Sequence, residues 1–181
     1  MKSKLKIIAI LQSRMGSSRL PNKALLKLNG KPAILRMTDR IKESKTIKEI
    51  WLATGKAKIN NKLESLFSNT KIKVFRGDDD DVLSRFIEIS KISKADIIIR
   101  LTGDCPLVDP KIIDETVELL INKKADYASN ILNRTFPDGL DVEVFTKRTL
   151  LETGEHSEAG FSREHVTTYM HGFHKNKYKK G

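Results

Sequence analysis

Residues 95–101 read ADIIIRL, and this stretch decides the fold. Its run of three isoleucines is typical of a strand that is buried on both faces of a parallel sheet. Residues 5–11, LKIIAIL, carry the same signal near the start of the chain, where Lys6 is the only interruption. Both runs are much shorter than the ~20 residues of a membrane-spanning helix, so we predict two interior strands and no membrane partner.

Segments with helical spacing alternate with further strand-like runs. We predict strands over residues 49–54, 71–75, 127–129 and 140–145, and helices over residues 33–44, 59–67, 80–90, 109–123 and 162–171. Asp109 and Pro110 are the expected cap and first-turn residue of the helix 109–123, and Ser162 is the expected cap of the last helix. This alternation indicates right-handed βαβ units and a mostly parallel sheet, which is an α/β fold.

Length and composition indicate one globular domain over residues 1–181. The fractions of hydrophobic and charged residues, 39% and 31%, exclude a disordered chain. The single cysteine, Cys105, cannot form an intramolecular disulfide, and no secretory signal precedes the first strand. We therefore expect a cytoplasmic protein.

The chain is strongly basic, with 34 lysine and arginine residues against 23 acidic residues and a net charge of +11. Such a surplus attracts polyanions, which include nucleic acid, a membrane surface or a nucleoside triphosphate. An aromatic content of 6% is too low for a base-stacking platform, and no nucleic-acid motif is visible. A solvated lysine-rich surface explains the same charge, so charge alone selects no partner.

Ligands of a parallel sheet bind at the carboxyl ends of the strands, so the loops that follow strands are where a site is expected. The loop after the first strand, residues 12–23, reads QSRMGSSRLPNK. Arg14 and Arg19 can hold phosphates in forked geometry, Lys23 adds a point charge, and Gly16 lets the backbone turn tightly. The loop is neither a Walker A nor a GxGxxG motif. A basic turn has the same composition, but the position after the first strand favours phosphate binding.

The loop after the stretch 95–101 reads TGDCP at residues 102–106. A carboxylate at this place, Asp104, can hold Mg²⁺, which prefers oxygen ligands. A turn that only closes the strand explains the same residues. Cys105 has no identifiable histidine partner nearby, so a packing thiol is favoured over a nucleophile.

A third polar stretch, FPDGLDVE, occupies residues 136–143. Asp141 and Glu143 alternate along the predicted strand, so we expect both to project from one face, where they can receive sugar hydroxyls or assist a metal. Paired carboxylates also serve glycoside hydrolases, but a basic phosphate loop has no part in that reaction.

Five motifs follow one another along the chain: RMGSSRLPNK at 14–23, RGDDDDVLSRF at 76–86, GDCPLVDP at 103–110, FPDGLDVEVF at 136–145 and REHVTTYM at 163–170. Together they resemble the spore-coat polysaccharide biosynthesis (SpsF-like) cytidylyltransferase family, which is similar to the CMP-sugar-acid synthetases of acylneuraminate and of 3-deoxy-manno-octulosonate. The resemblance covers essentially the whole chain. It implies a nucleotide-diphospho-sugar transferase fold, a Rossmann-like three-layer sandwich that binds CTP over the sheet, and a homodimer.

The resemblance also implies roles for particular residues. Arg14, Lys23 and Asp104 form the catalytic set, and Asp104 is the ligand of Mg²⁺. The nucleotide-binding set comprises Gln12, Arg14, Gly16, Ser17, Ser18, Arg19, Lys23, Arg100, Thr102 and Gly103, with Gln12 near the cytosine. The sugar-binding set comprises Asp81, Arg85, Asp141 and Glu143. The implied reaction transfers CMP from CTP to a sugar or sugar acid, with release of pyrophosphate, for a surface polysaccharide.

Two other clusters of polar residues receive structural interpretations. The four aspartates at 78–81 look like the metal motif of glycosyltransferases, but they precede a predicted helix, so Asp79 and Asp80 are the expected helix caps. The four histidines lack the cysteine or acidic pattern of a zinc site, and we expect them to face solvent or to pack. They are His156, His165, His171 and His174.

The end of the sequence departs from the family pattern. The family usually continues past its REHVT-like helix into a segment with another acidic residue for the metal site, whereas this sequence ends at Gly181. A shortened homologue, a fragment and a chain that completes its site with another subunit all agree with this ending. Two rival functions stay open at this point, a glycosyltransferase of the same fold that consumes a nucleotide sugar and a basic nucleic-acid-binding module.

Overall fold

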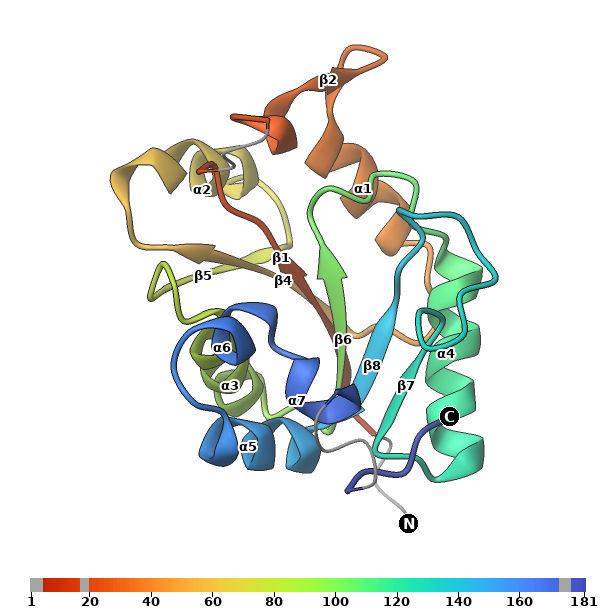
Figure 1. The fold of residues 1–181 in the computed structure, drawn as a ribbon. Helices are drawn as coiled ribbons and strands as arrows, with labels where there is room; N and C mark the ends of the chain where they lie inside the picture. The colour runs from red at the N-terminus through yellow and green to blue at the C-terminus, as the bar shows by residue number, and fades with distance from the viewer. Residues whose placement is uncertain (1–4, 17–19, 173–176) are drawn as a thin grey trace.

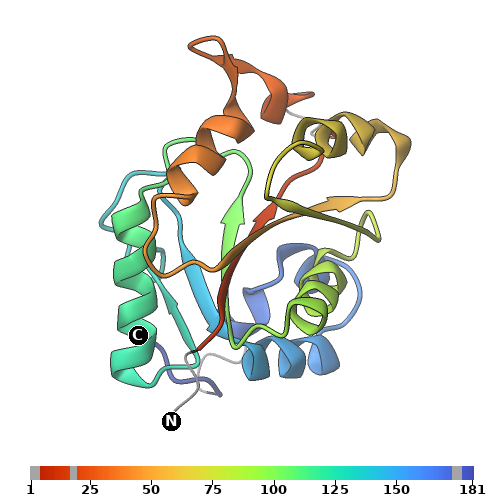
Figure 2. The same cartoon turned by 180° about the vertical axis from the view of Figure 1, so that it is seen from behind.

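The computed structural model describes residues 5–16, 20–172 and 177–181. A six-stranded sheet with the order β5-β4-β1-β6-β8-β7 forms the middle layer. Helices cover both of its faces, which gives three layers (Figures 1 and 2). The strands are β1 (Ile7–Gln12), β4 (Glu49–Gly55), β5 (Lys73–Gly77), β6 (Ile97–Thr102), β7 (Tyr127–Ser129) and β8 (Glu143–Thr146). This architecture agrees with the predicted α/β sandwich.

The two isoleucine-rich stretches, residues 5–11 and 95–101, form neighbouring strands in the centre of the sheet. β1 and β6 pair in parallel, in a register that runs from Ile7 opposite Ile97 to Gln12 opposite Thr102. β4 and β5 extend the parallel part, while β8 and β7 are antiparallel to their neighbours. The predicted interior strands are therefore confirmed, each shifted by one or two residues toward its carboxyl end.

Successive side chains of a strand point to opposite faces, so each central strand serves two cores. Ala9 and Ile99 belong to the core beneath α1 (Ala33–Ile41), α2 (Asn61–Phe67) and α4 (Pro110–Lys123). Ile10 and Ile98 belong to the opposite core, beneath α3 (Val82–Ser93), α5 (Lys147–His156) and α7 (Thr168–His171). On this second face the apolar series ends in the polar Gln12 and Arg100, at the carboxyl ends of β1 and β6.

Helix caps confirm one prediction and correct another. Asp109 accepts a hydrogen bond from the backbone N–H of Lys111 and caps α4, as predicted. Asp81 caps α3 by accepting from the N–H of Ser84, so the assignment of the cap to Asp79 and Asp80 is wrong. The cap has to be the residue just before the first helical residue, and α3 begins at Val82.

The carboxyl-terminal third differs most from the sequence-based expectation. The predicted strand 140–145 begins only at Glu143, and the helix α5 was not predicted because Gly154 in its last turn weakens the helical pattern. The predicted helix 162–171 is broken into α6 (Phe161–His165) and α7. Buried Val166 has φ 59° between the two pieces, and the residue before α6 is Gly160 rather than the expected cap Ser162.

A short hairpin of β2 (Lys27–Leu28) and β3 (Lys31–Pro32) projects beyond the body of the molecule (Figure 1). Its turn is Asn29-Gly30, and both residues have positive φ, as a two-residue hairpin turn requires. Two short 3₁₀ turns, at Lys23–Leu25 and Lys58–Asn60, complete the elements. Within the part of the chain that the structure describes, no helix is long and apolar enough to cross a membrane.

The last described residues lie along the outer edge of β7. The backbone N–H of Asp126 donates to the carbonyl of Lys179 at 2.7 Å, and the N–H of Gly181 donates to the carbonyl of Tyr127 at 3.1 Å. Tyr178 is buried in the core beneath α5 and α7. These contacts fix residues 178–181 against the sheet.

Candidate active site

A cleft of about 330 Å³ opens at the carboxyl ends of β1 and β6, where the sequence places its polar loops. Nine of the predicted site residues line it: Gln12, Arg14, Gly16, Lys23, Arg85, Arg100, Thr102, Gly103 and Asp104. The cleft also includes Ser13 and His165, which were not assigned to the site. Ser17, Ser18 and Arg19 lie outside the described residues. The cleft is thus rich in cations, with a single carboxylate among its lining residues.

Asp104 and Lys23, which both line the cleft, form an ion pair with 2.5 Å between Oδ2 of Asp104 and Nζ of Lys23. Burial alone would raise the pKa of Asp104, but the hydrogen bond and the charge of Lys23 lower it below its ordinary value. The carboxylate is therefore ionised at neutral pH. It lies directly after β6, while Lys23 begins the 3₁₀ turn that follows the basic loop.

A close approach of two loops forms the floor beside Asp104. The N–H of Gly103 donates to the carbonyl of Gln12 at 2.8 Å. A Cβ at position 103 would lie only 2.7 Å from Cβ and Oγ of Ser13, so this contact requires glycine. For Gly16, in contrast, no atom of the described residues lies within 4 Å of an added Cβ, and its φ is not positive, so the backbone there does not require glycine.

Arg14 is paired with a residue that the sequence analysis did not assign to the site. Nη2 of Arg14 lies 3.0 Å from Oε1 of Glu164, which belongs to α6. The next residue, His165, lines the cleft, and its ring centroid lies 4.2 Å from that of Phe161. The REHVTTYM motif was the sequence signal for this side of the cleft, but its residue types alone did not indicate a role in binding or catalysis.

Arg85 has an unusual environment, because its charged side chain is almost fully buried. The residue is 1% exposed, and its Nε and Nη1 have no hydrogen-bond partner among the described residues. Burial lowers the pKa of Arg85, and the nearby charge of Arg14 lowers it further, while three aspartates of the loop 78–81 act in the opposite direction. A Cβ on Gly77 would lie 2.5 Å from Cγ of Arg85, so the glycine makes room for the arginine stem.

The side chain of Arg100 extends from β6 into the cleft and is hydrogen-bonded to Glu143 and Gln12. Its Nη1 donates to Oε2 of Glu143, and its Nε donates to Oε1 of Gln12 at 3.3 Å. The hydroxyl of Tyr127 donates to the other oxygen of Glu143 at 2.7 Å. Glu143 is 3% exposed and does not line the cleft, so its predicted contact with a sugar finds no support in this geometry.

The other predicted sugar-binding carboxylates also point elsewhere. Asp141 precedes β8 and lies 3.1 Å from Nη1 of Arg134, so the expectation that it shares a strand face with Glu143 is wrong. Asp81 caps α3 and accepts from Nε of Arg163 at 2.7 Å. Neither carboxylate lines the cleft, whereas Arg85 does.

Cysteine and histidine residues behave mainly as packing groups. Cys105 is buried, and burial raises the pKa of its thiol, which agrees with the predicted packing role. His171 lies 5.6 Å from the ring of Tyr127, and His156 stacks on Tyr169, whereas His165 faces the cleft. His174 lies outside the described residues. The described part of the chain contains no group of three or more metal-binding side chains.

Comparison with known proteins places this cleft in a family context. The model of the family described as "Cytidylyltransferase" matches residues 8–179. The uncharacterised protein MJ1063 of Methanocaldococcus jannaschii is 40% identical over 92% of this chain and 68% of its own length. The spore coat polysaccharide biosynthesis protein SpsF of Bacillus subtilis is 33% identical over 91% and 69%. An 8-amino-3,8-dideoxy-manno-octulosonate cytidylyltransferase of Shewanella pealeana is 27% identical over 90% and 66%.

Solved structures give the same picture. A cytidylyltransferase from Leptospira borgpetersenii superposes with a TM-score of 0.92 and 34% identity, over 98% of this chain and 75% of that one. The CMP:2-keto-3-deoxy-manno-octonic acid synthetase complexed with CTP has a TM-score of 0.73 and 18% identity, over 97% and 89%. At that identity the second likeness shows the fold alone.

Proposed function

The chain belongs to the cytidylyltransferase family, and we propose that it transfers the CMP group of CTP to a sugar acid in the cleft at the ends of β1 and β6. The buried guanidinium of Arg85 carries this proposal. Its Nε and Nη1 lack hydrogen-bond partners among the described residues, and burying a charged group in this way costs roughly several kcal/mol unless a ligand meets it. A ligand with phosphate or carboxylate oxygens supplies the missing acceptors. The names of the Bacillus and Shewanella relatives support a sugar acid that enters a surface polysaccharide.

Two cations of the cleft are suited to the triphosphate. Arg14 and Lys23 come from the loop after β1 and already face oxygen atoms, those of Glu164 and Asp104. Phosphate oxygens can replace these carboxylates as hydrogen-bond acceptors with little movement of the cations. The proposal keeps Ser17, Ser18 and Arg19 as further contacts from the same loop.

Asp104 is the residue that would hold Mg²⁺. Its carboxylate is ionised and accessible from the cleft, with a side chain that is 44% exposed. Mg²⁺ in proteins is commonly bound by one or two carboxylates and completes its shell with phosphate oxygens and water, so a single aspartate fits this ion. When bound, Mg²⁺ supplies positive charge to the phosphate oxygens. Lys23 would then be available to bind a phosphate oxygen in place of the carboxylate.

In the proposed reaction a hydroxyl oxygen of the sugar acid attacks the α-phosphorus of CTP. A bond forms between that oxygen and phosphorus, and the bond from the α-phosphorus to the bridging oxygen breaks. Pyrophosphate leaves with the electron pair, and the hydroxyl proton passes to solvent. Arg14 and Lys23 stabilise the negative charge that develops on pyrophosphate, while the cleft holds both substrates in line.

The test combines ligand binding with turnover. Of CTP, UTP, ATP and GTP, each with Mg²⁺, CTP is expected to raise the unfolding temperature most, because a ligand that binds only the folded state stabilises it. With CTP and 3-deoxy-manno-octulosonate as acceptor, Arg14→Ala and Asp104→Asn are each expected to reduce pyrophosphate release by about 100-fold. Full activity of either variant would contradict the role of that residue.

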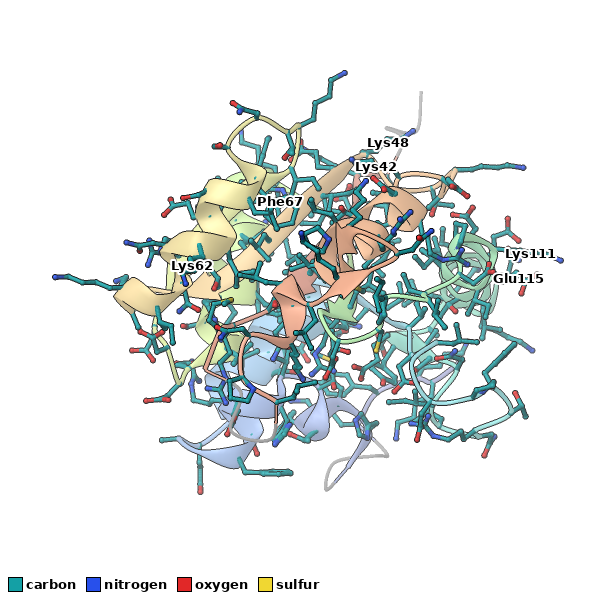
Figure 3. All side chains as sticks on the ribbon, turned by 90° about the horizontal axis from the view of Figure 1, so that it is seen from above. Lys42, Lys48, Lys62, Phe67, Lys111 and Glu115 are labelled. Carbon is teal, nitrogen blue, oxygen red and sulfur yellow. The ribbon has the colours of Figure 1, made fainter. Side chains whose placement is uncertain are left out.

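Two control variants match the tested ones. Asp39→Asn removes a carboxylate that is also 44% exposed and also paired with a lysine, but lies outside the cleft. Lys111→Ala removes a cation from the outer face of α4, where Figure 3 shows it beside Glu115. Both are expected to keep activity. Transfer from a UDP- or GDP-sugar would favour a glycosyltransferase, and salt-sensitive binding of DNA or RNA would favour a nucleic-acid module.

A further inference from the structure

The strand order brings a buried acid directly beneath a cation of the cleft. β8 runs antiparallel to β6, so its first residue, Glu143, stands opposite Arg100 at the end of the sheet where the cleft opens. Tyr127 of β7 is on the same face, in the core beneath α5 and α7. Three neighbouring strands therefore contribute to one polar cluster at the base of the cleft.

Contacts within this cluster hold two of the three guanidinium nitrogens of Arg100. Glu143 accepts from Nη1, Gln12 accepts from Nε at 3.3 Å, and the hydroxyl of Tyr127 donates to the other oxygen of Glu143 at 2.7 Å. Glu143 and Tyr127 are buried, whereas Arg100 lines the cleft. Any ligand of this arginine thus meets a guanidinium whose direction is set in advance.

The charge state of the cluster suits this role. Burial would raise the pKa of Glu143, but the charge of Arg100 and the hydrogen bonds of Thr167 and Tyr127 lower it below its ordinary value. Burial and the neighbouring carboxylate raise the pKa of Tyr127, so the hydroxyl stays a neutral donor. Glu143 also offsets one of the three guanidinium charges of the cleft, those of Arg14, Arg85 and Arg100.

We propose that Glu143 is a positioning residue, which with Tyr127 orients Arg100 to bind an anionic oxygen pair of the substrates. This inference rests on the proposed function for the identity of the substrates, and it replaces the predicted contact of Glu143 with the sugar. The oxygen pair belongs to a phosphate of the nucleotide or to the carboxylate of the acceptor. Because the guanidinium is already held in place, less side-chain entropy is lost when a ligand binds to it.

The first readout needs no ligand. In NMR spectra of arginine Nη–H groups, the signal of Nη1 of Arg100, the nitrogen that donates to Glu143, is identified by its loss in Arg100→Met. We expect this signal to be protected from solvent exchange in the wild type, weaker in Tyr127→Phe and exchange-averaged in Glu143→Gln. An unchanged signal in Glu143→Gln would overturn the proposal. If Glu143→Gln does not fold, Tyr127→Phe decides, because it removes only one hydroxyl.

The second readout is the dissociation constant for two probes, CTP with Mg²⁺ and 3-deoxy-manno-octulosonate, measured well below the unfolding temperature. Glu143→Gln is expected to weaken one of them by about tenfold or more, since it leaves a cleft cation without its buried partner. Loss of CTP affinity assigns Arg100 to a phosphate, and loss of acid affinity assigns it to the carboxylate. Unchanged affinity for both probes in a folded variant would overturn the proposal.

A double-mutant cycle separates positioning from simple stabilisation. In the Arg100→Met background, Glu143→Gln is expected to cause no further loss of affinity, because its effect passes through Arg100. Glu152→Gln is the matched control, since Glu152 is also paired with an arginine, Arg148, away from the cleft. If the wild type shows the protected Arg100 signal but binds neither probe, the proposed function fails and the orientation of Arg100 by Glu143 stands.

Discussion

At the scale of single residues, the buried arginine of α3 is the least expected feature of the cleft. Sequence analysis placed Arg85 beside the sugar only by family resemblance, because no pattern in the chain shows that its stem is buried. The structure supplies the reason: Gly77 leaves the space into which the stem packs. Glycine at this position would therefore contribute to the proposed ligand binding through its neighbour.

A substitution tests this dependence. Gly77→Ala is expected to displace the Arg85 side chain, because the new Cβ would lie 2.5 Å from its Cγ, and to weaken CTP binding by about tenfold or more. Gly154→Ala is the control, since its Cβ would lie 2.4 Å from Cδ1 of Ile87, away from the cleft. Calorimetric titration of both variants should show reduced affinity only for Gly77→Ala, while both lose stability. Wild-type affinity of Gly77→Ala would refute the proposed function of this glycine.

Glu49 predicts a pH dependence of stability. Burial would raise its pKa, but hydrogen bonds from Lys6, Lys73 and Trp51 outweigh burial and lower the pKa from 4.5 to about 2. A lowered acidic pKa stabilises the folded state above the unfolded-state pKa, and this stabilisation is lost as the pH falls toward 2. After allowance for solvent screening, it amounts to about 1–2 kcal/mol at neutral pH.

The measurement is the free energy of unfolding in urea between pH 2 and pH 6. Glu49→Gln is expected to unfold more easily at pH 6 and to lose part of the decline between pH 5 and pH 2 that the wild type shows. Equal slopes for the two proteins would mean that the ion pairs of Glu49 contribute nothing to stability. Other acids whose pKa is also lowered, such as Asp114, account for the slope that remains in both proteins.

At the scale of elements, predictions succeeded where one strong local signal decided the structure. The isoleucine-rich strands and the Asp109-Pro110 helix start were found because burial and capping act over a few residues. α5 was missed because Gly154 weakens its local pattern, and the break at Val166 was missed because packing against the second core decides it. The late start of β8 had the largest effect on the site, since it removed Asp141 from the strand and left Glu143 buried.

The aspartate run before α3 allows a direct test of capping. Asp81→Ala is expected to lower stability by about 1 kcal/mol or more, because the N–H of Ser84 loses its acceptor and Arg163 loses its carboxylate partner. Asp80→Ala, one residue away, is expected to change stability by less than about 0.5 kcal/mol, since Asp80 is exposed and does not cap the helix. Thermal unfolding of the two variants compares them, and an equal effect would contradict the assignment of the cap to Asp81.

At the scale of the whole molecule, the site was predictable because the parallel sheet collects the ends of β1 and β6 at one edge. That rule, together with the family resemblance, located most of the residues that line the cleft. It could not find Glu164 or His165, because α6 reaches the cleft only through its packing against α3 and α7. Contacts between residues 150 positions apart leave no local pattern in the sequence.

The expected homodimer also belongs to this scale and stays a prediction. It rests on the family resemblance, and light scattering of the purified protein measures it directly. A dimer would have twice the chain mass of 20.5 kDa. A mass of one chain at concentrations that support full activity would contradict it.

Residues 178–181 cover one edge strand of the sheet, β7, whereas the other edge strand, β5, has no such cover among the described residues. The two edges therefore differ in how easily a strand of another polypeptide could pair with them. Hydrogen bonds from residues 178–181 already occupy the outer side of β7, so another polypeptide would have to peel this segment away before it could pair there. β5 forms the opposite border and carries Lys73 and Arg76, charges that discourage docking of a foreign strand. Resistance to fibril formation would thus depend on steric cover at one border and on charged, ion-paired side chains at the other, so high salt should weaken only the second.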